Sequence, residues 1–366
     1  KFAKASIGDV EAVCLPYLFN KQIQTRFLDY WFSQFPKANE RMLYELDTVK
    51  RSLALENEIR ERLSFSGELH FFRHHLAHMA SAYYLSGFER SALFTIDGLG
   101  EMESTLTGEA EQNGIRIFEE DSALWPNSLG SLYAAATRYL GFAAHCDEGK
   151  VMGLAPYGNP ATYRPIFEEM IQLDGNGRFA FNLDFLRYPF RQHSHFSEKF
   201  LERCGPPRDP KTEITERHRD IAAALQEATE RVMLHAARNL HERTKNKNIC
   251  MAGGVALNCV ANGRILRETA FERIYVQPAA NDAGTAVGAA LHYYYGKNPD
   301  APRRNLGHAY LGTGYSDEEI EKILRKKYLS FERAKNVCAQ TATFLAEGKI
   351  IGWFNGRMEF GPRALG

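Results

Sequence analysis

The stretch from residue 215 to residue 295 alternates helices with strands, and this alternation limits the possible folds more than any other feature. One long helix is expected over Thr215–Arg243, because apolar side chains recur every three or four positions from Ile221 to Leu240. The segments after it are predicted as strand, glycine turn, helix, strand and helix: Asn248–Met251, Gly253-Gly254, Ala256–Glu268, Arg273–Gln277 and Asp282–Tyr295. This order predicts an α/β architecture with a mixed sheet.

Length and charge exclude several classes of protein. A chain of 366 residues exceeds one typical hydrophobic core, so two lobes are expected. Its 45 Lys and Arg residues balance 45 Asp and Glu residues, so tight sequence-independent binding of nucleic acid is not indicated. No apolar run approaches the roughly 20 residues that cross a bilayer. We therefore expect no membrane partner. The six cysteines form no CxxC pair, so we expect reduced thiols in the cytoplasm.

Two histidines at helical spacing suggest a metal site. The run from Arg73 to Tyr84 is predicted as a helix, so His74 and His78 project from one face about one turn apart. Two imidazoles at that spacing can hold one divalent ion with a third ligand from elsewhere in the chain. A zinc peptidase would carry Glu directly after its first histidine, and His75 stands there instead. A pair of ordinary surface or capping histidines is the alternative.

Two acidic, glycine-containing loops accompany these histidines. Asp97-Gly98 follows an apolar strand over Ser91–Ile96, and Asn281–Gly284 opens a helix. Such loops can hold a metal and a phosphate, because backbone N–H groups approach the anion closely. Each also has a structural alternative: Asp-Gly is a common hairpin turn, and Asn281 or Asp282 can cap a helix.

Two further loops have features of a nucleotide site. In the segment 145–158, Glu148 near a helix start can accept ribose hydroxyls, and Gly153 would let a sugar approach the backbone. Acidic residues there can equally stabilise the helix N-terminus. The Gly253-Gly254 turn between a strand and a helix directs backbone donors toward an anion. It is not the GxGxxG pattern, so a dinucleotide-binding fold is not supported.

Eight motifs carry a family resemblance: HHLAHMASAYY, TIDGLGE, NSLGSLYAAATRYLGF, DEGKVMGLAPYG, CGPPRDPKTEITERHRDIAAALQEATERV, CMAGGVALNCVANGRI, QPAANDAGTAVGAA and GRMEFGPRALG. Together they resemble the O-carbamoyltransferases of antibiotic and nodulation-factor biosynthesis, the group of the tobramycin, cephamycin and Nod-factor enzymes. The resemblance runs from about residue 65 to the end.

The resemblance implies a fold and a domain order. It implies an actin/sugar-kinase-like fold, as in the tRNA threonylcarbamoyladenosine transferase, with a duplicated lobe and mixed sheets, followed by the start of an adenylate-forming α/β lobe. The carbamoyl-transfer domain is expected at residues 1–330, and the beginning of the carbamoyl-adenylate-forming domain at residues 331–366. The family's opening strands and most of the adenylate-forming lobe are expected to be missing.

The resemblance also implies a reaction. In this family the C-terminal lobe makes carbamoyl-adenylate from carbamoyl phosphate and ATP. The N-terminal lobe passes the carbamoyl group to a hydroxyl of a natural-product or sugar acceptor. With most of the adenylate-forming lobe missing, this chain is expected to transfer a preformed carbamoyl group at most. The partners expected are therefore a nucleotide and a hydroxylated small molecule, with a homodimer left open.

Site residues follow from the resemblance position by position. It implies a divalent metal, iron(II) first and otherwise magnesium, manganese or zinc, on His74, His78 and Asp282. His74 and Asp97 are the predicted catalytic residues, with Asp97 as the candidate general base because it ends the strand after the metal helix. The residues expected to hold the nucleotide, or to belong to the adenylate-forming lobe, are Glu148, Lys150, Gly153, Gly254, Asn258, Gly284 and Arg363, with Arg357 as a further candidate.

Two other functions stay open on the sequence. A tRNA threonylcarbamoyladenosine-type transferase would share the lobe, although zero net charge and the GRMEFGPRALG segment argue against it. A non-catalytic actin-like nucleotide-binding partner is the other, although the complete metal triad argues against that. The acceptor is not specified. The aromatic stretch 179–195 is a candidate lining for its pocket, but aromatic residues more often belong to the core.

Overall fold

The fold is taken from a computed structural model, which describes residues 6–18, 21–112, 114–191 and 195–362. The chain forms two compact units, Lys1–Asn305 and Leu306–Gly366. The domain boundary predicted at residues 330 and 331 lies inside the second unit and stays a prediction. All residues that the sequence assigns to the metal site lie in the first unit.

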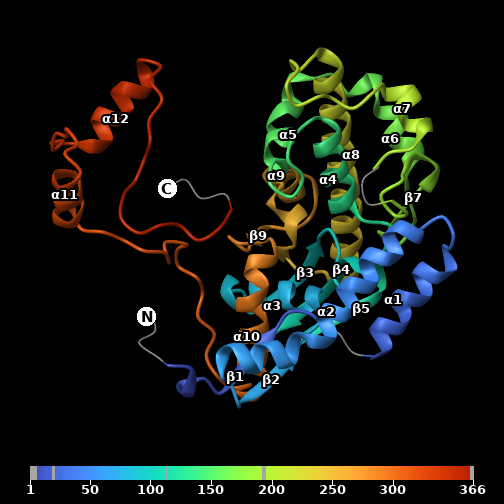
Figure 1. The fold of residues 1–366 in the computed structure, drawn as a ribbon, viewed down its shortest axis with the longest axis horizontal. Helices are drawn as coiled ribbons and strands as arrows, with labels where there is room; N and C mark the ends of the chain where they lie inside the picture. The colour runs from blue at the N-terminus through green and yellow to red at the C-terminus, as the bar shows by residue number, and fades with distance from the viewer. Residues whose placement is uncertain (1–5, 19–20, 113, 192–194, 363–366) are drawn as a thin grey trace. The chain divides into compact units, whose positions relative to one another are not determined.

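A five-stranded mixed sheet forms the centre of the first unit (Figure 1). In the order β5-β4-β3-β8-β9, its strands are Gly114–Leu124, Glu103–Glu111, Arg90–Ile96, Asn248–Ala252 and Arg273–Val276. Strand β4 runs antiparallel to both of its neighbours, whereas β3, β8 and β9 are parallel. This sheet confirms the predicted α/β class with a mixed sheet.

Strand β3 is covered on both faces. Successive side chains of a strand point to opposite sides of the sheet. Phe94 and Ile96 accordingly join the core that also contains residues of the long helix α8 (Glu216–Thr244), whereas Leu93 joins a second core with Met79 and Tyr83 of helix α3. Six of the seven residues of β3 are buried, so hydrophobic contacts on both faces fix the position where this strand ends.

Helices α3 (His74–Ser86) and α10 (Thr285–Lys297) lie side by side on one face of the sheet (Figure 1). Their close approach depends on Gly288, since a Cβ at that position would lie 1.8 Å from the carbonyl oxygen of Ala77. The small side chains that the sequence places along both helices therefore bring the start of α10 close to the start of α3.

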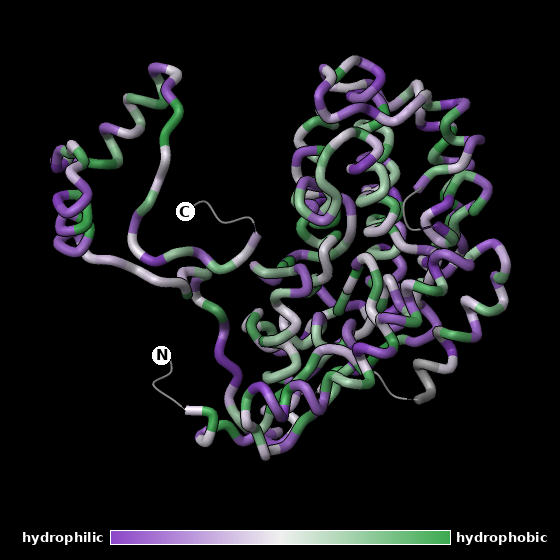
Figure 2. The backbone as a smooth tube through the Cα atoms, in the orientation of Figure 1, coloured by the Kyte–Doolittle hydropathy of each residue, from purple (hydrophilic) through white to green (hydrophobic). Residues whose placement is uncertain are grey.

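A smaller two-stranded parallel sheet pairs β1 (Ala12–Leu15) with β2 (Glu68–Phe71). Between these strands run helices α1 (Lys21–Ser33) and α2 (Asn39–Leu63), along which hydrophilic and hydrophobic residues alternate (Figure 2). The β1–β2 pairing brings the residues after β1 next to the start of α3, which follows β2 directly.

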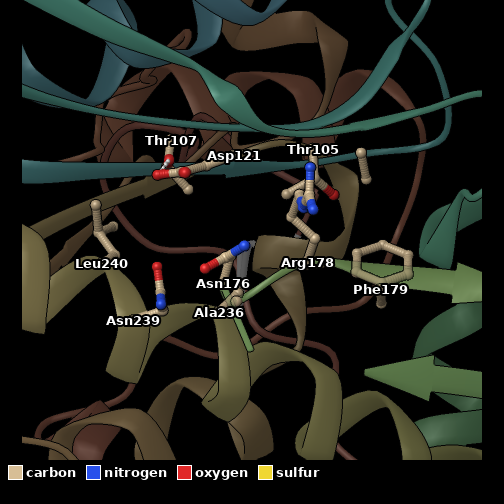
Figure 3. Close-up of a pocket in the computed structure, with 11 residues that line it drawn as sticks. Thr105, Thr107, Asp121, Asn176, Arg178, Phe179, Ala236, Asn239 and Leu240 are labelled. Atoms are coloured by element: carbon tan, nitrogen blue, oxygen red, sulfur yellow. Dashed lines mark hydrogen bonds between the residues drawn. The ribbon is translucent and has the colours of Figure 1, made fainter. Parts of the chain in front are cut away.

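The other face of the five-stranded sheet carries α8 and shorter helices: α4 (Leu129–Tyr139), α5 (Glu148–Leu154), α6 (Arg164–Met170), α7 (Glu198–Cys204) and α9 (Cys259–Glu268). The hairpin of β6 (Ile171–Leu173) and β7 (Phe179–Phe181) closes this side. Figure 3 shows Asn176 and Arg178 of its turn facing Thr105 and Thr107 of β4 and Asn239 of α8 across a cavity of about 10 Å³. That volume is close to the lower limit for one water molecule.

The second unit contains helices α11 (Asp317–Lys326) and α12 (Val337–Ala346). Its segments are joined by a bridge between Gly314 and Arg357, and Nε of Arg357 donates to the carbonyl oxygen of Gly312 over 3.0 Å. In the described parts of both units, no helix combines the length and the apolar character that crossing a membrane requires.

Candidate functional site

Four side chains from three distant parts of the sequence converge beside the end of β3. His74 and His78 come from the first turns of α3, Asp97 follows β3 directly, and Asp282 begins the short helix η6 (Asp282–Gly284) before α10. One ligand atom from each lies within 4.8 Å of all the others. We call these four residues the histidine–carboxylate cluster. The i,i+4 spacing therefore places both histidines as predicted, and the packing of α10 on α3 adds Asp282.

The distances within the cluster suit a metal ion. The Nε2 atoms of the two histidines lie 3.0 Å apart. Oδ2 of Asp97 lies 3.2 Å from Nε2 of His74 and 3.0 Å from Nε2 of His78. Oδ1 of Asp282 lies 3.4 and 3.7 Å from the same two nitrogens. Bonds of about 2.0–2.2 Å place neighbouring donor atoms about 3.0–3.6 Å apart around one ion. The two imidazoles and the Asp282 carboxylate at these spacings fit a divalent cation, and the carboxylate of Asp97 lies beside them.

The electrostatics of the cluster favour positive charge between the carboxylates. Burial lowers the pKa of His74, but hydrogen bonds to Asp282 and Asp97 outweigh burial and raise it to about 10. Burial raises the pKa of Asp282, yet its bonds to His74 and His78 bring it down to about 2. A bound cation would supply, in place of protons, positive charge between the buried carboxylate of Asp97 and the more exposed carboxylate of Asp282.

His75, the third histidine of the helix, has a different role. It is fully buried, with Nδ1 2.8 Å from the hydroxyl of Thr95 and Nε2 3.0 Å from the carbonyl oxygen of Glu103. Burial, followed by the charges of His74 and His78, lowers its pKa to about 3. His75 is thus a neutral residue that ties α3 to β3 and β4.

Asp97 lies within the cluster, and backbone hydrogen bonds fix the orientation of its carboxylate. Its Oδ1 accepts hydrogen bonds from the backbone N–H groups of Gly98 (2.8 Å) and Gly254 (3.0 Å), which leaves Oδ2 facing the histidines. The turn that presents Gly254 needs glycine at position 253, where φ is +96° and a Cβ would lie 2.2 Å from the carbonyl oxygen of Ile96. Gly254 therefore contacts the predicted catalytic carboxylate. Its role in nucleotide binding stays a prediction.

Two residues that sequence reasoning missed support the cluster. The buried carboxylate of Glu101 accepts the backbone N–H groups of His74 (3.0 Å) and Leu18 (2.7 Å), so it fixes the start of α3. The hydroxyl of Tyr17 donates to Oδ2 of Asp282 over 2.9 Å, and its ring stacks on His74 at 4.5 Å. Glu101 belongs to the TIDGLGE motif and could have been found there. Tyr17 had no local signal, because its position depends on β1 pairing with β2.

The predicted nucleotide residues of α5 lie at or near the surface. Oε1 of Glu148 accepts the N–H of His145 over 2.6 Å, a local contact of the kind expected at a helix start. Nζ of Lys150 lies 2.8 Å from Oδ1 of Asp147, and a Cβ on Gly153 would meet no atom within 4 Å. Nothing in these contacts prevents a nucleotide from approaching α5, and its binding there stays a prediction.

Other predicted residues are engaged within the protein. Asn258 is buried, caps α9 by accepting the N–H of Ala261 (3.1 Å), and exchanges two hydrogen bonds of 2.8 and 3.0 Å with the amide of Gln226. Gly284 is packed so closely that a Cβ would lie 2.2 Å from the carbonyl oxygen of Ala279. These contacts give Asn258 and Gly284 structural roles, and nucleotide binding by them stays a prediction. Arg363 lies outside the described residues.

Comparison with known proteins supports the sequence motifs. Residues 32–291 match the family model described as Carbamoyltransferase N-terminus, and residues 342–366 match Carbamoyltransferase C-terminus. The chain is 41% identical to nodulation protein NolNO of Sinorhizobium fredii, covering 81% of this chain and 42% of that protein. It is 28% identical to 3'-hydroxymethylcephem-O-carbamoyltransferase of Streptomyces clavuligerus, covering 60% and 38%.

A solved structure of full-length HypF in the phosphate- and nucleotide-bound form aligns with 13% identity and a TM-score of 0.34, covering 66% of this chain and 45% of that chain. The chain spans about half the length of the curated relatives it matches. Since the N-terminal model alone matches well over half of the chain, this protein belongs to the carbamoyltransferase family.

Proposed function

We propose that this chain transfers the carbamoyl group of carbamoyl-adenylate to a hydroxyl of a natural-product or sugar acceptor, with a divalent metal, iron(II) first, at His74, His78 and Asp282. The observation that carries the proposal is the histidine–carboxylate cluster in a member of this family. Two relatives have names that connect them with nodulation and with O-carbamoylation of a cephem. Both names are consistent with a hydroxylated small molecule as acceptor.

The residues around the cluster suit this transfer. The acceptor oxygen bonds to the carbamoyl carbon, the bond from that carbon to the phosphate oxygen breaks, and AMP leaves. Asp97 is positioned to take the hydroxyl proton, since two backbone N–H groups hold one carboxylate oxygen while the other faces the cluster. When bound, the metal supplies positive charge that stabilises negative charge developing on oxygen. Fixed geometry contributes to the rate by avoiding the entropy cost of alignment.

Carbamoyl transfer can be tested with the donor supplied directly. The chain, loaded with iron(II) without oxygen, is mixed with synthetic [14C]carbamoyl-adenylate and hydroxylated natural products, including 3'-hydroxymethylcephem. Labelled product and acceptor-dependent AMP release are expected, and both should be lost in His78→Ala but retained in His308→Ala, which changes an exposed histidine of the second unit. AMP release at the same rate with and without acceptor, or full activity of His78→Ala, would contradict the proposal.

We propose further that residues 331–366 belong to a lobe that forms carbamoyl-adenylate from carbamoyl phosphate and ATP, with Arg363 and Arg357 contacting its substrates. The match of residues 342–366 to the C-terminal family model supports this assignment. In protein that carries the whole lobe, carbamoyl phosphate should trigger pyrophosphate release from ATP without any acceptor. Arg363→Ala should abolish this pyrophosphate release, whereas His74→Ala should leave it largely unchanged. The opposite pattern would show that the two roles are assigned to the wrong lobes.

A further inference from the structure

A cavity of about 480 Å³ adjoins the histidine–carboxylate cluster. Gly98 and Leu99, the residues directly after Asp97, form part of its wall. Consecutive Cα atoms are about 3.8 Å apart, so the cavity begins within one residue of the predicted base. Its volume is that of a typical small-molecule pocket. The cavity in Figure 3, in contrast, has room for a single water molecule at most.

The wall of this cavity is positively charged. Arg41 of α2, Arg138 of α4 and Arg191 line it, and no Asp or Glu occurs among the described residues around it. Arg41 and Arg191 have ion-pair partners outside the lining, Glu45 at 2.5 Å and Glu40 at 3.6 Å. Within the described chain, Arg138 has no ion-pair partner. Guanidinium groups from three segments that converge in this way suit an oxyanion such as a carboxylate.

Two buried donors at the same wall lack acceptors. Nε1 of Trp125, a residue only 7% exposed, and Nε of Arg41 are buried and have no hydrogen-bond partner among residues 6–18, 21–112, 114–191 and 195–362. A buried donor without an acceptor costs about 1–3 kcal/mol, so native proteins seldom leave one.

Aromatic rings give the cavity a flat apolar side. Trp125 and Tyr188 meet edge to face at 5.5 Å, and the guanidinium of Arg41 lies 5.6 Å from the Trp125 ring and 5.4 Å from that of Tyr44. All four residues line the cavity. Aromatic faces bind the apolar faces of rings, whereas guanidinium groups bind oxygen atoms.

We infer that this cavity holds the carbamoyl acceptor and selects a hydroxylated ring compound that carries a carboxylate. The inference rests on the proposed function and adds its substrate class. The carboxylate pairs with Arg138 and Arg191, the ring packs against Trp125, and a hydroxyl lies at the part of the wall that Gly98 and Leu99 form.

Three matched glycosides test the cavity by binding alone. They are 4-nitrophenyl β-D-glucuronide, 4-nitrophenyl β-D-glucoside, which lacks the carboxylate, and 4-nitrophenyl β-D-glucoside 6-phosphate, which carries a different anion. The readout is the indole N–H signal of Trp125 in a ¹⁵N-labelled sample, assigned with Trp125→Phe. The glucuronide should shift this signal saturably, with at least about tenfold tighter binding than the glucoside, as for one charged hydrogen-bond pair. Tighter binding of the phosphate than of the glucuronide would overturn the choice of carboxylate.

Variants separate the cavity from the rest of the chain. Arg138→Gln should weaken glucuronide binding about tenfold, and Arg267→Gln, an equal change of charge on the exposed face of α9, should leave it unchanged. Equal affinity for glucuronide and glucoside, or no effect of Arg138→Gln, would overturn the inference. Displacement of the glucuronide by ATP would identify the cavity as a nucleotide site and overturn it too.

The same measurement distinguishes the cavity from the proposed reaction. Binding of the glucuronide requires neither a carbamoyl donor nor a metal, so it should persist in His78→Ala and after treatment with EDTA. Persistent binding supports the cavity assignment even if the carbamoyl-transfer assay fails, in which case only the proposed function is rejected. If the wild-type protein transfers the carbamoyl group but does not bind the glucuronide, only the assignment of the acceptor to this cavity is rejected.

Discussion

The Nε2 atoms of His74 and His78 lie 3.0 Å apart in a part of helix α3 where both side chains are fully buried. At most one of the two nitrogens can donate a proton to the other, and Oδ2 of Asp97 lies within 3.2 Å of both. Such an arrangement is unfavourable for neutral imidazoles alone and favourable around a shared cation. The predictions below follow from this arrangement and from the residues that maintain it.

Removal of one histidine should remove the metal. His78→Ala is expected to bind less than about one tenth of the divalent metal bound by the wild-type chain, because it leaves one imidazole in the site. The metal should also stabilise the fold by about 2.7 kcal/mol when present at a hundred times its Kd. Metal analysis and thermal unfolding with and without EDTA measure both effects. Unchanged metal content in His78→Ala would refute the assignment, and His308→Ala is the control.

Tyr17→Phe should weaken the metal site without disturbing the fold. The substitution removes only the hydroxyl that donates to Asp282, and it keeps the ring that stacks on His74. Residues that orient metal ligands typically contribute about 10–100-fold to metal affinity, so a rise of at least about tenfold in the metal Kd is expected. Competition with a chelator gives the value. Tyr310→Phe, which changes an exposed ring in the second unit, should have no effect.

Glu101→Gln should destabilise the first unit. The buried carboxylate accepts two backbone N–H groups, and an amide places an N–H₂ group where one oxygen stood. We expect a loss of about 1–3 kcal/mol in the free energy of unfolding by urea. Glu111→Gln, at the exposed end of β4, provides the comparison, and an equal effect of the two substitutions would show that Glu101 does not fix the start of α3.

Gly288→Ala should separate α10 from α3. The new Cβ would lie 1.8 Å from the carbonyl oxygen of Ala77, so one helix must move. A destabilisation of about 1–3 kcal/mol is expected, together with weaker metal binding because Asp282 precedes α10. Gly296→Ala is a matched control in the same helix, since its Cβ would meet nothing within 4 Å. That control should stabilise the protein by up to about 1 kcal/mol through helix propensity, and similar results for the two variants would contradict the packing argument.

The sequence predicts the individual residues of the site better than the contacts that bring them together in space. The spacing of His74 and His78 predicts that both side chains lie on one face, since four residues make about one helical turn. Asp282 was assigned through family resemblance, and the packing of α10 on α3 explains its place. Asp97 was predicted as a base, but its position among the four cluster residues depends on where β3 ends relative to α3. No local pattern contains that distance.

Residues with polar side chains near glycine loops were harder to interpret. Asn258 lies in a loop typical of anion binding, yet the structure pairs its amide with Gln226 of α8, which lies far away in sequence. Tyr17 precedes two long helices, and only the pairing of β1 with β2 brings it to His74. Contacts between residues that are distant in sequence decided both cases. Within the aromatic stretch 179–195, Phe179, Phe181 and Phe185 belong to the core, while Tyr188 reaches the cavity beside the cluster.

The origin of the cluster in three separated segments has a consequence for the order of folding. More than two hundred residues separate His74 from Asp282, so the site has high contact order and cannot form until the segment that begins α10 has been synthesised and docked. A ribosome-bound chain shorter than this can make α3 and β3 but holds an incomplete set of ligands. Capture of the proposed metal is therefore expected late in biogenesis, and metal content in a pulse-chase experiment would report how many newly made chains have completed their first unit.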